Sequence, residues 1–433
     1  MLRRSVVRIA WLLTLALAAG CSRADAGGKV VLRFWGLGRE GEVVQELVRG
    51  FEREHPGIAV RVQQIPWTAA HEKMLTAFVG DASPDLAQLG NTWVPEFVAL
   101  DALQPLDSAL ARSSSVDSAS YFPGIWRTNE IAGTTYGVPW YVDTRVVFYR
   151  KDLLRRAGYA SFPTTWADWL DAMRAIKRIV GPGRYPIYLP TNEWTQPVVF
   201  GMQAGSPLLK DDARYGAFSD SAFRRAFDFY LSIYREGLSP IKGLNDVANP
   251  YQEFERGFFA MWITGPWNLG EFARRLPDSM QGSWATAPLP GPTGPASGLS
   301  TAGGSSIVIF RSSRHQREAW LLLEYLSRPA QQQRFYELTG DLPARIDAWS
   351  DSLRSADPNR RAFWEQLQRV EPTPKVPEWE QIATKVFEYA EQSIRGGVAP
   401  DTVLARLDRD VNGLLEKRRW LLEHGALARA ERP

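Results

Sequence analysis

Residues 29–90 alternate between strand and helix patterns, and this alternation constrains the fold more than any other feature of the chain. Three β-branched or alternating stretches, KVVLRFW, IAVRVQQI and DLAQLG, stand at residues 29–35, 58–65 and 85–90. Apolar side chains recur at helical spacing between them, over residues 39–54 and 69–80. Strands that alternate with helices form parallel sheets, and ligands gather at the carboxyl ends of such strands. The sequence therefore predicts an α/β fold whose binding residues follow these strands.

Length and charge narrow the class of protein. The chain has 433 residues, which suits two or three domains. Its net charge is +3, but residues 1–20 contain three Arg and no acid, so the rest of the chain is neutral (3 − 3 = 0). No basic run is present, and a nucleic-acid partner is therefore not expected.

The N-terminus predicts export. MLRRSVVRIAWLLTLALAAGC has the basic, apolar and small-residue regions of a secretory signal, and its apolar run is short for a membrane span. The LAAGC ending resembles a bacterial lipobox, in which Cys21 is lipidated; a plain signal peptide with an incidental cysteine is the alternative. We expect a signal peptide over 1–20, a lipidated tether over 21–28, and a bacterial membrane anchor that leaves the protein facing the periplasm or cell exterior. Because Cys21 is the only cysteine, no disulfide is expected.

Later segments predict further elements and a connection. Residues 137–154 indicate an extended stretch, then a strand from Val142 to Tyr149 and a helix that opens at Lys151. The Pro- and Gly-rich residues 287–304 are typical of an interdomain connection or an exposed loop. From Glu318 onward the pattern is nearly all helical.

The stretch FFAMWITGPWNLGEF, residues 258–272, carries an apolar strand straight into a turn at Gly265 and Pro266 that presents Trp267. A core tryptophan needs no such turn, whereas one that meets a ligand does. Trp267 is therefore predicted to face a ligand, and core packing is the alternative.

The chain holds 17 tryptophans, several of them at predicted strand ends. A pyranose ring has an apolar face and a rim of hydroxyls, so its site needs flat aromatic platforms with fixed polar groups around them. Tryptophan-rich loops with scattered carboxylates and amides meet both needs. Candidate aromatic contacts at strand ends are Trp35, Trp67, Trp93, Trp140 and Tyr141.

Four segments in order carry a family resemblance: GVPWYVDTRVVFYRKDLLRRAG with PTTWADW after it, FERGFFAMWITGPW, STAGGSSIVI and LTGDLPARIDAW. Behind a lipoprotein signal, they resemble the extracellular solute-binding proteins (family 1) of ABC sugar importers, the family that contains maltose-binding protein. The resemblance covers essentially the whole chain after the signal. It implies a periplasmic-binding-protein-like fold, with two α/β lobes around a ligand cleft and a hinge of crossing segments.

The resemblance also implies how the chain is divided and what it does. The N-terminal lobe is expected over 29–142 plus 296–345, and the C-terminal lobe over 143–295 plus 346–425. A di- or oligosaccharide is captured in the cleft and delivered to ABC permease subunits with their ATPase. The protein is then a monomer and not an enzyme, with no cofactor and no metal.

The same resemblance suggests roles for individual residues. Trp267 and Trp379 would stack on sugar, Asp143 would accept hydroxyl hydrogen bonds, and Trp194 with Asn192 or Glu193 would contact ligand. Arg39 and Glu40 correspond to a basic and an acidic contact of the first loop, although a solvated helix N-terminus explains them equally well. Gly303 and Gly304 would admit a ligand close to the backbone or simply serve the crossing turn. Arg345 lies in the PAR motif of the family, and a structural role is the alternative to a role in binding.

Two departures leave the sugar open. Asn91, Thr92 and Trp93 replace an acid followed by Arg after the third strand, and Arg150 replaces a usual Asn. Asn91 and Trp93 are therefore candidate contacts to a sugar other than maltose. Two other classes stay open: a binding protein for glycerol-3-phosphate, a polyamine or a peptide, and an anchored glycoside hydrolase, which would need two flanking carboxylates.

Overall fold

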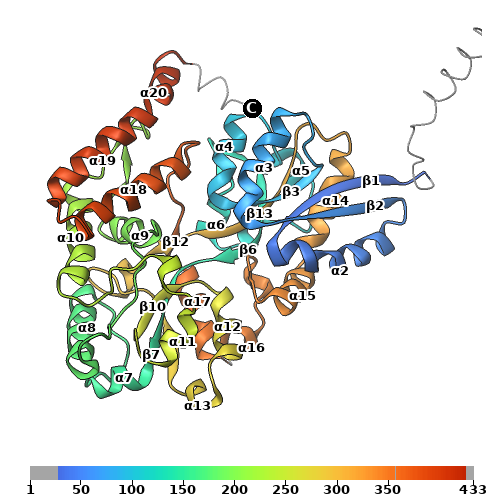
Figure 1. Cartoon of the computed structure of the whole chain (residues 1–433). Helices are drawn as coiled ribbons and strands as arrows, with labels where there is room; N and C mark the ends of the chain where they lie inside the picture. The colour runs from blue at the N-terminus through green and yellow to red at the C-terminus, as the bar shows by residue number, and fades with distance from the viewer. Residues whose placement is uncertain (1–27, 356, 426–433) are drawn as a thin grey trace, which may run out of the picture.

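The computed structural model describes residues 28–355 and 357–425. The predicted signal peptide, Cys21 and most of the tether lie outside these residues. The described chain forms two α/β lobes (Figure 1). The N-terminal lobe is built on a six-stranded sheet and the C-terminal lobe on a three-stranded sheet. Within the described ranges, no helix is long and apolar enough to cross a membrane.

The N-terminal sheet has the strand order β14-β6-β13-β3-β1-β2. Its strands are β1 (Val30–Leu37), β2 (Ile58–Ile65), β3 (Leu86–Gly90), β6 (Gly137–Asp143), β13 (Gly303–Ile309) and β14 (Leu342–Pro343). Strand β1 pairs in parallel with β2 and β3, which confirms the predicted arrangement of the first three strands. Strand β13 lies between β3 and β6 and is antiparallel to both, so the complete sheet is mixed.

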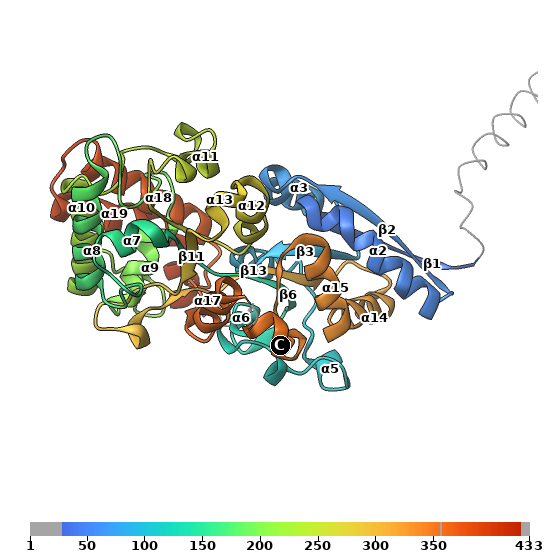
Figure 2. The same cartoon turned by 90° about the horizontal axis from the view of Figure 1, so that it is seen from below.

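Alternation along β1 explains why helices cover both faces of this sheet. Leu32 and Phe34 point into one core and Trp35 and Leu37 into another, because successive side chains of a strand face opposite sides. The first core is covered by α2 (Gly38–Glu54), α14 (Gln316–Leu326) and α15 (Pro329–Thr339), and the second by α3 (Trp67–Val79) and α4 (Val94–Ala99). Figure 2 shows α3 and α15 on opposite sides of the sheet.

In the C-terminal lobe, β7 (Val146–Arg150) is the central strand, antiparallel to β10 (Met261–Thr264) and β11 (Trp284–Ala287). The larger helices around it are α8 (Trp166–Val180), α9 (Thr195–Gln203), α10 (Ser221–Arg235), α12 (Trp267–Arg275), α17 (Pro358–Leu367), α18 (Trp379–Ile394) and α19 (Pro400–Leu414). Four aromatic side chains recur at helical spacing along α10: Phe223, Phe227, Tyr230 and Tyr234. All four lie in the core of this lobe, so their spacing reflects packing rather than binding.

Shorter elements complete the described chain. They are η1 (Asn91–Trp93), α5 (Asp107–Leu110), η2 (Ser118–Ser120), α6 (Pro123–Arg127), β4 (Glu130–Ile131), β5 (Thr134–Thr135), α7 (Lys151–Arg156), β8 (Leu209–Lys210), β9 (Tyr215–Gly216), η3 (Leu244–Asp246), α11 (Pro250–Glu255), α13 (Asp278–Gln281), η4 (Pro295–Ser297), β12 (Ser300–Thr301), η5 (Ile346–Ala348), α16 (Asp351–Ser355), β15 (Val370–Glu371) and α20 (Glu416–Glu423). The mainly helical character expected beyond Glu318 is confirmed.

The chain passes between the sheets at several points. The single strand expected from Val142 to Tyr149 is wrong, because β6 ends at Asp143 in one sheet and β7 begins at Val146 in the other. A second passage follows β11 and runs through β12, which pairs in parallel with β15, before β13 enters the N-terminal sheet. These neighbouring passages form the crossing segments between the lobes.

Candidate ligand-binding cavity

A cavity of about 500 Å³ lies between the two lobes. Residues after the carboxyl ends of β1, β2 and β3 line its N-terminal side, as the strand pattern predicts. The full lining is Glu40, Trp67, Gly90, Asn91, Thr92, Trp93, Tyr141, Val142, Asp143, Arg145, Trp194, Thr195, Pro266, Trp267, Thr301, Ala302, Gly303, Gly304, Asp341 and Thr373. Ten of the residues predicted from the sequence are therefore brought together: Glu40, Trp67, Asn91, Trp93, Tyr141, Asp143, Trp194, Trp267, Gly303 and Gly304.

Two exposed tryptophans, one from each lobe, form aromatic walls of the cavity. Trp67 opens α3 and is 37% exposed, and Trp267 opens α12 and is 42% exposed. Each ring lies against a glycine: a Cβ added at Gly38 would stand 2.6 Å from the Trp67 ring, and one at Gly265 would stand 1.9 Å from the Trp267 ring. Gly265 is thus needed for the position that the Trp267 ring adopts.

Two further tryptophans line the cavity. Trp93, in η1, packs against Trp67 with ring centroids 5.8 Å apart. Trp194, at the N-cap of α9, lies edge-on to Trp379 with centroids 5.7 Å apart. Because Trp379 is only 1% exposed, it backs Trp194 rather than lining the cavity.

Arg145 links several predicted residues, although the sequence did not single it out. Its guanidinium lies 4.6 Å from the centre of the Trp267 ring, forms an ion pair with Asp143, and stands 3.9 Å from Glu193 Oε1. Glu193 also accepts a hydrogen bond from Gln196, so it takes part in the site through other side chains rather than as a lining residue. Arg145 is the one cation among the lining residues, and its charge is already paired.

Glu40 stands over a buried polar network. Tyr141 donates its hydroxyl hydrogen to Glu40 Oε1 at 2.9 Å, and Trp67 Nε1 donates to the same oxygen at 3.3 Å. Ser305 Oγ in turn donates to the Tyr141 oxygen at 3.1 Å. Burial raises the pKa of Glu40, while its own backbone amide and the Tyr141 and Trp67 donors oppose that rise. The network fixes the carboxyl of Glu40 at the cavity wall.

Three carboxyls therefore line the cavity, and all have raised pKa values. Burial raises the pKa of Asp341 to about 7, helped by the negative charges of Glu40 and Asp143. Burial also raises the pKa of Asp143, although Arg145 opposes it. Asp341 was missed because it follows a helix end within the LTGDLPAR segment and has no strand-end pattern to mark it. Such a wall of acceptors suits a ligand rich in hydroxyl donors or one with positive charge.

Gly303 and Gly304 line the cavity, but the sheet accounts for them as well. A Cβ at Gly303 would stand 2.4 Å from the backbone oxygen of Asp143, and one at Gly304 would stand 2.3 Å from that of Tyr141. Gly304 also has φ of 122°, which strains any other residue. The close pairing of β13 with β6 therefore requires both glycines.

Besides Glu193, and Asn192, whose side chain accepts a hydrogen bond from the Leu244 amide, four predicted residues do not line the cavity. Trp35 points into the core beneath α3, where Lys73 Nζ lies 5.3 Å from its ring centre. Trp140 is 1% exposed and stacks on Phe335. Trp379 is buried behind Trp194, as described above. Arg39 lines an adjacent groove instead and pairs with Glu42 at 2.8 Å. Strand alternation and helix packing decide these orientations.

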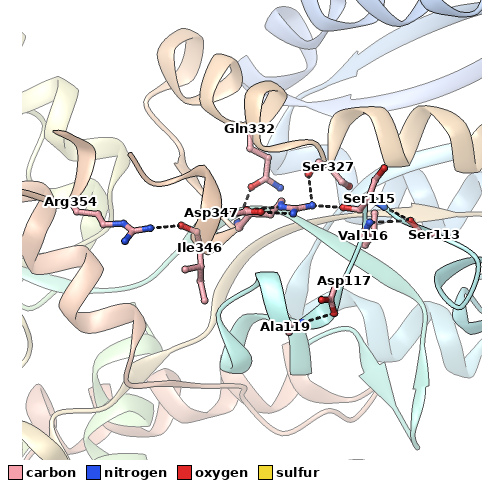
Figure 3. Close-up of polar contacts among 11 residues, drawn as sticks. Ser113, Ser115, Val116, Asp117, Ala119, Ser327, Gln332, Ile346, Asp347 and Arg354 are labelled. Atoms are coloured by element: carbon pink, nitrogen blue, oxygen red, sulfur yellow. Dashed lines mark hydrogen bonds and ion pairs between the residues drawn. The ribbon is translucent and has the colours of Figure 1, made fainter. Parts of the chain in front are cut away.

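Arg345 has a structural role. Its side chain donates to Asp347 at 2.8 and 2.6 Å, and to the backbone oxygens of Ser115 and Ser327. Figure 3 shows these partners, with Gln332 beside them, joining the end of α14, α15, η5 and the loop before η2. The described residues include no group of three or more His, Cys, Asp or Glu placed to hold a metal ion.

The fold and this cavity define an extracellular solute-binding protein. Residues 35–333 match the model of the family described as bacterial extracellular solute-binding protein, and the chain belongs to that family. The family resemblance drawn from the sequence is therefore confirmed.

Solved structures and related sequences of binding proteins resemble this chain as well. The sugar-binding protein MalE of Xanthomonas citri is 50% identical, with a TM-score of 0.88 over 91% of this chain and 99% of that one. A solute-binding protein of Thermotoga lettingae bound to α-D-tagatose is 26% identical, with a TM-score of 0.75 over 89% and 100%. The diacetylchitobiose-binding protein DasA of Streptomyces coelicolor is 24% identical over 77% of each chain. The match to MalE confirms the predicted periplasmic-binding-protein-like fold.

Proposed function

We propose that the protein captures a carbohydrate, a di- or oligosaccharide, in the cavity between its lobes and delivers it to the permease of an ABC importer. The observation that carries this proposal is the pair of exposed rings of Trp67 and Trp267, one from each lobe, with the carboxyls of Glu40, Asp143 and Asp341 at the same cavity. Aromatic faces suit the apolar faces of sugar rings, and carboxylates accept hydrogen bonds from hydroxyls. The sugar-binding relatives support the same ligand class.

Of the non-sugar ligands left open by the sequence, glycerol-3-phosphate and a polyamine fit the lining residues to different degrees. A phosphate ester would need free cationic donors, whereas Arg145 is already paired with Asp143 and three carboxyls would repel the anion. A polyamine is the second candidate, because three carboxyls among four tryptophans suit a ligand that carries positive charge.

The deciding experiment is titration of intrinsic tryptophan fluorescence in residues 22–433, which include every described residue. The panel contains glucose, mannitol, maltose, maltotriose, diacetylchitobiose, glycerol-3-phosphate and spermidine. Each mixture is analysed afterwards for cleaved glycosidic bonds. We expect a saturable response to an intact di- or oligosaccharide.

Each of the other outcomes would indicate a different ligand or an enzymatic activity. A response to spermidine alone would replace the sugar with a polyamine. A response to glycerol-3-phosphate alone would contradict both candidates. Cleavage of a sugar would overturn our inference that the protein binds without catalysis, an inference that rests on the family and on relatives that are binding proteins.

We further propose that the exported chain is a monomer anchored through lipid on Cys21, with lobe boundaries near 143, 296 and 346. The fold family supports export. Replacing Cys21 with Ser should release the protein from the membrane fraction. Retention in the membrane fraction after that change would contradict the lipid anchor.

A further inference from the structure

His71 of α3 lies directly behind one wall of the cavity. Its ring centroid is 5.1 Å from that of Trp93, which in turn packs on Trp67. On its other side, His71 Nε2 shares a hydrogen bond of 2.6 Å with Glu96 Oε2 of α4. His71 does not line the cavity itself, but any shift of its ring changes the support of Trp93.

The opposite lobe meets this position through the first turn of α18. Helix α18 packs against η1, the short helix that contains Trp93, and Glu380 of its first turn accepts a hydrogen bond from Thr92 of η1. Trp379 of α18 backs Trp194 on the other wall of the cavity. Helix α18 thus contacts η1, which carries Trp93 on the N-terminal side of the cavity, and also Trp194 on the C-terminal side.

The carboxyls that flank Trp379 are poorly satisfied. Glu380 Oε1 and Glu378 Oε2 are buried, and neither atom has a hydrogen-bond partner within the described part of the chain. A buried carboxylate oxygen without a donor is costly, and a nearby cation reduces that cost. Burial raises the pKa of Glu380, while a hydrogen bond from the Thr92 side chain and the charge of His71 oppose the rise.

We propose that protonated His71, hydrogen-bonded to Glu96 and packed on Trp93, is a positioning residue whose charge also steadies Glu380 on the facing helix α18, and that it so holds Trp93 and Trp194 in place for ligand. The proposal rests on the sugar-binding function only for its effect on affinity. Without the proton on His71, the repulsion between the charges of Glu96 and Glu380 would lose the positive charge that offsets it, and the Thr92 hydrogen bond would remain. The contact therefore weakens as His71 loses its proton.

The charges around His71 agree on the direction of this pH dependence. The Glu96 hydrogen bond raises the pKa of His71, burial opposes it, and the charges of Glu96, Glu380 and Glu72 raise it further. Glu378 also faces Glu96, and Lys417 and Arg418 of α20 act on Glu378. Because the pKa is raised, the stabilising contact is complete below the ordinary value of 6.5 and is lost as pH rises through the higher folded value.

The test needs no ligand in its first arm. The chain has four histidines, so imidazole NMR signals of residues 22–433 can be titrated individually, and His71→Gln identifies the signal of His71. We expect the midpoint of His71 to lie above 6.5 and to fall in Glu380→Gln. Glu388→Gln is the matched control, because Glu388 lies on the same helix and pairs with Lys385. An unchanged midpoint in Glu380→Gln, or an equal fall in Glu388→Gln, would overturn the proposal.

The second arm measures affinity for maltose, or for the panel sugar that responds, in a double-mutant cycle of His71→Gln and Glu380→Gln. Each change should weaken binding about threefold to tenfold near pH 6, and the double variant should lose no more than the single ones. Near pH 9 the coupling should vanish. The cycle is repeated in a background of Asp341→Asn, which shows whether the titration of Asp341 contributes to the pH dependence. Additive losses at both pH values would overturn the positioning role, whereas silence toward every sugar would contradict only the sugar proposal.

Discussion

Among single residues, Trp267 gives the sharpest test of the cavity. Its ring is 42% exposed and lies over Gly265, so it contributes little to the core but offers an apolar platform to a ligand. We expect Trp267→Ala to weaken sugar binding tenfold or more, about 1.4 kcal/mol, with little change in melting temperature. Isothermal titration calorimetry measures the first quantity and a thermal melt the second.

Trp420→Ala is the control for this prediction. Trp420 is 53% exposed on α20, away from the cavity lining, and should leave affinity unchanged. Full affinity in Trp267→Ala, or a large loss of its stability, would show that the ring is not a platform.

Asp341 predicts a pH dependence of stability. Burial raises its pKa from 3.8 to about 7, so between these values the folded chain holds a proton that the unfolded chain has released. Stability therefore falls as pH rises across this window. Asp341→Asn should remove part of that slope and melt higher than the natural chain near pH 8. Thermal melts at a series of pH values would contradict this prediction if the two proteins kept the same slope.

Individual binding residues were predictable where a local pattern fixes their position. Trp67 and Trp93 follow strands of a parallel sheet, and Trp267 follows a Gly-Pro turn, so all three reach the cavity. Trp35 and Trp140 lie on strands whose neighbours decide which face is buried, and that information is not local. Asp341 enters the cavity only because β14 pairs with β6, which no nearby residue signals.

At the scale of elements, the turn between β10 and α12 carries its own prediction. A Cβ at Gly265 would overlap the Trp267 ring, so Gly265→Ala should displace the platform while leaving the strand and helix in place. We expect affinity for sugar to fall severalfold, in the direction of Trp267→Ala. Fluorescence titration measures this loss.

Gly282→Ala is the matched control, because a Cβ there would meet no atom within 4 Å. It should change neither affinity nor stability. Combining Gly265→Ala with Trp267→Ala adds a further check, since the glycine should no longer matter once the ring is gone. Two fully additive losses would mean that Gly265 acts on the site by another route.

Strands and helices were predictable where the elements they pack against are close in the sequence. Strands β1, β2 and β3 with their helices follow one another along the chain, and the sequence predicted their parallel pairing. Strand β13 joins the same sheet from more than 200 residues away. The break between β6 and β7 was missed because both strands are apolar and only their different partners separate them.

At the scale of the whole molecule, the packing predicts that the lobes unfold together. One hydrophobic cluster runs from Phe34 in the N-terminal sheet to Phe148 and Phe272 in the C-terminal lobe. The chain also crosses between the sheets more than once, so neither half is a continuous segment. We therefore expect one unfolding transition in differential scanning calorimetry, with equal calorimetric and van't Hoff enthalpies.

A sugar that touches both lobes should raise this transition as a whole. At a free concentration of 100 times the dissociation constant, binding adds about 2.7 kcal/mol to the free energy of unfolding. Trp267→Ala should melt at the same temperature without sugar and gain less from the same sugar concentration, since its dissociation constant is higher. If the melt instead splits into two transitions and sugar moves only one of them, the ligand is held by a single lobe and the proposed capture between lobes is wrong.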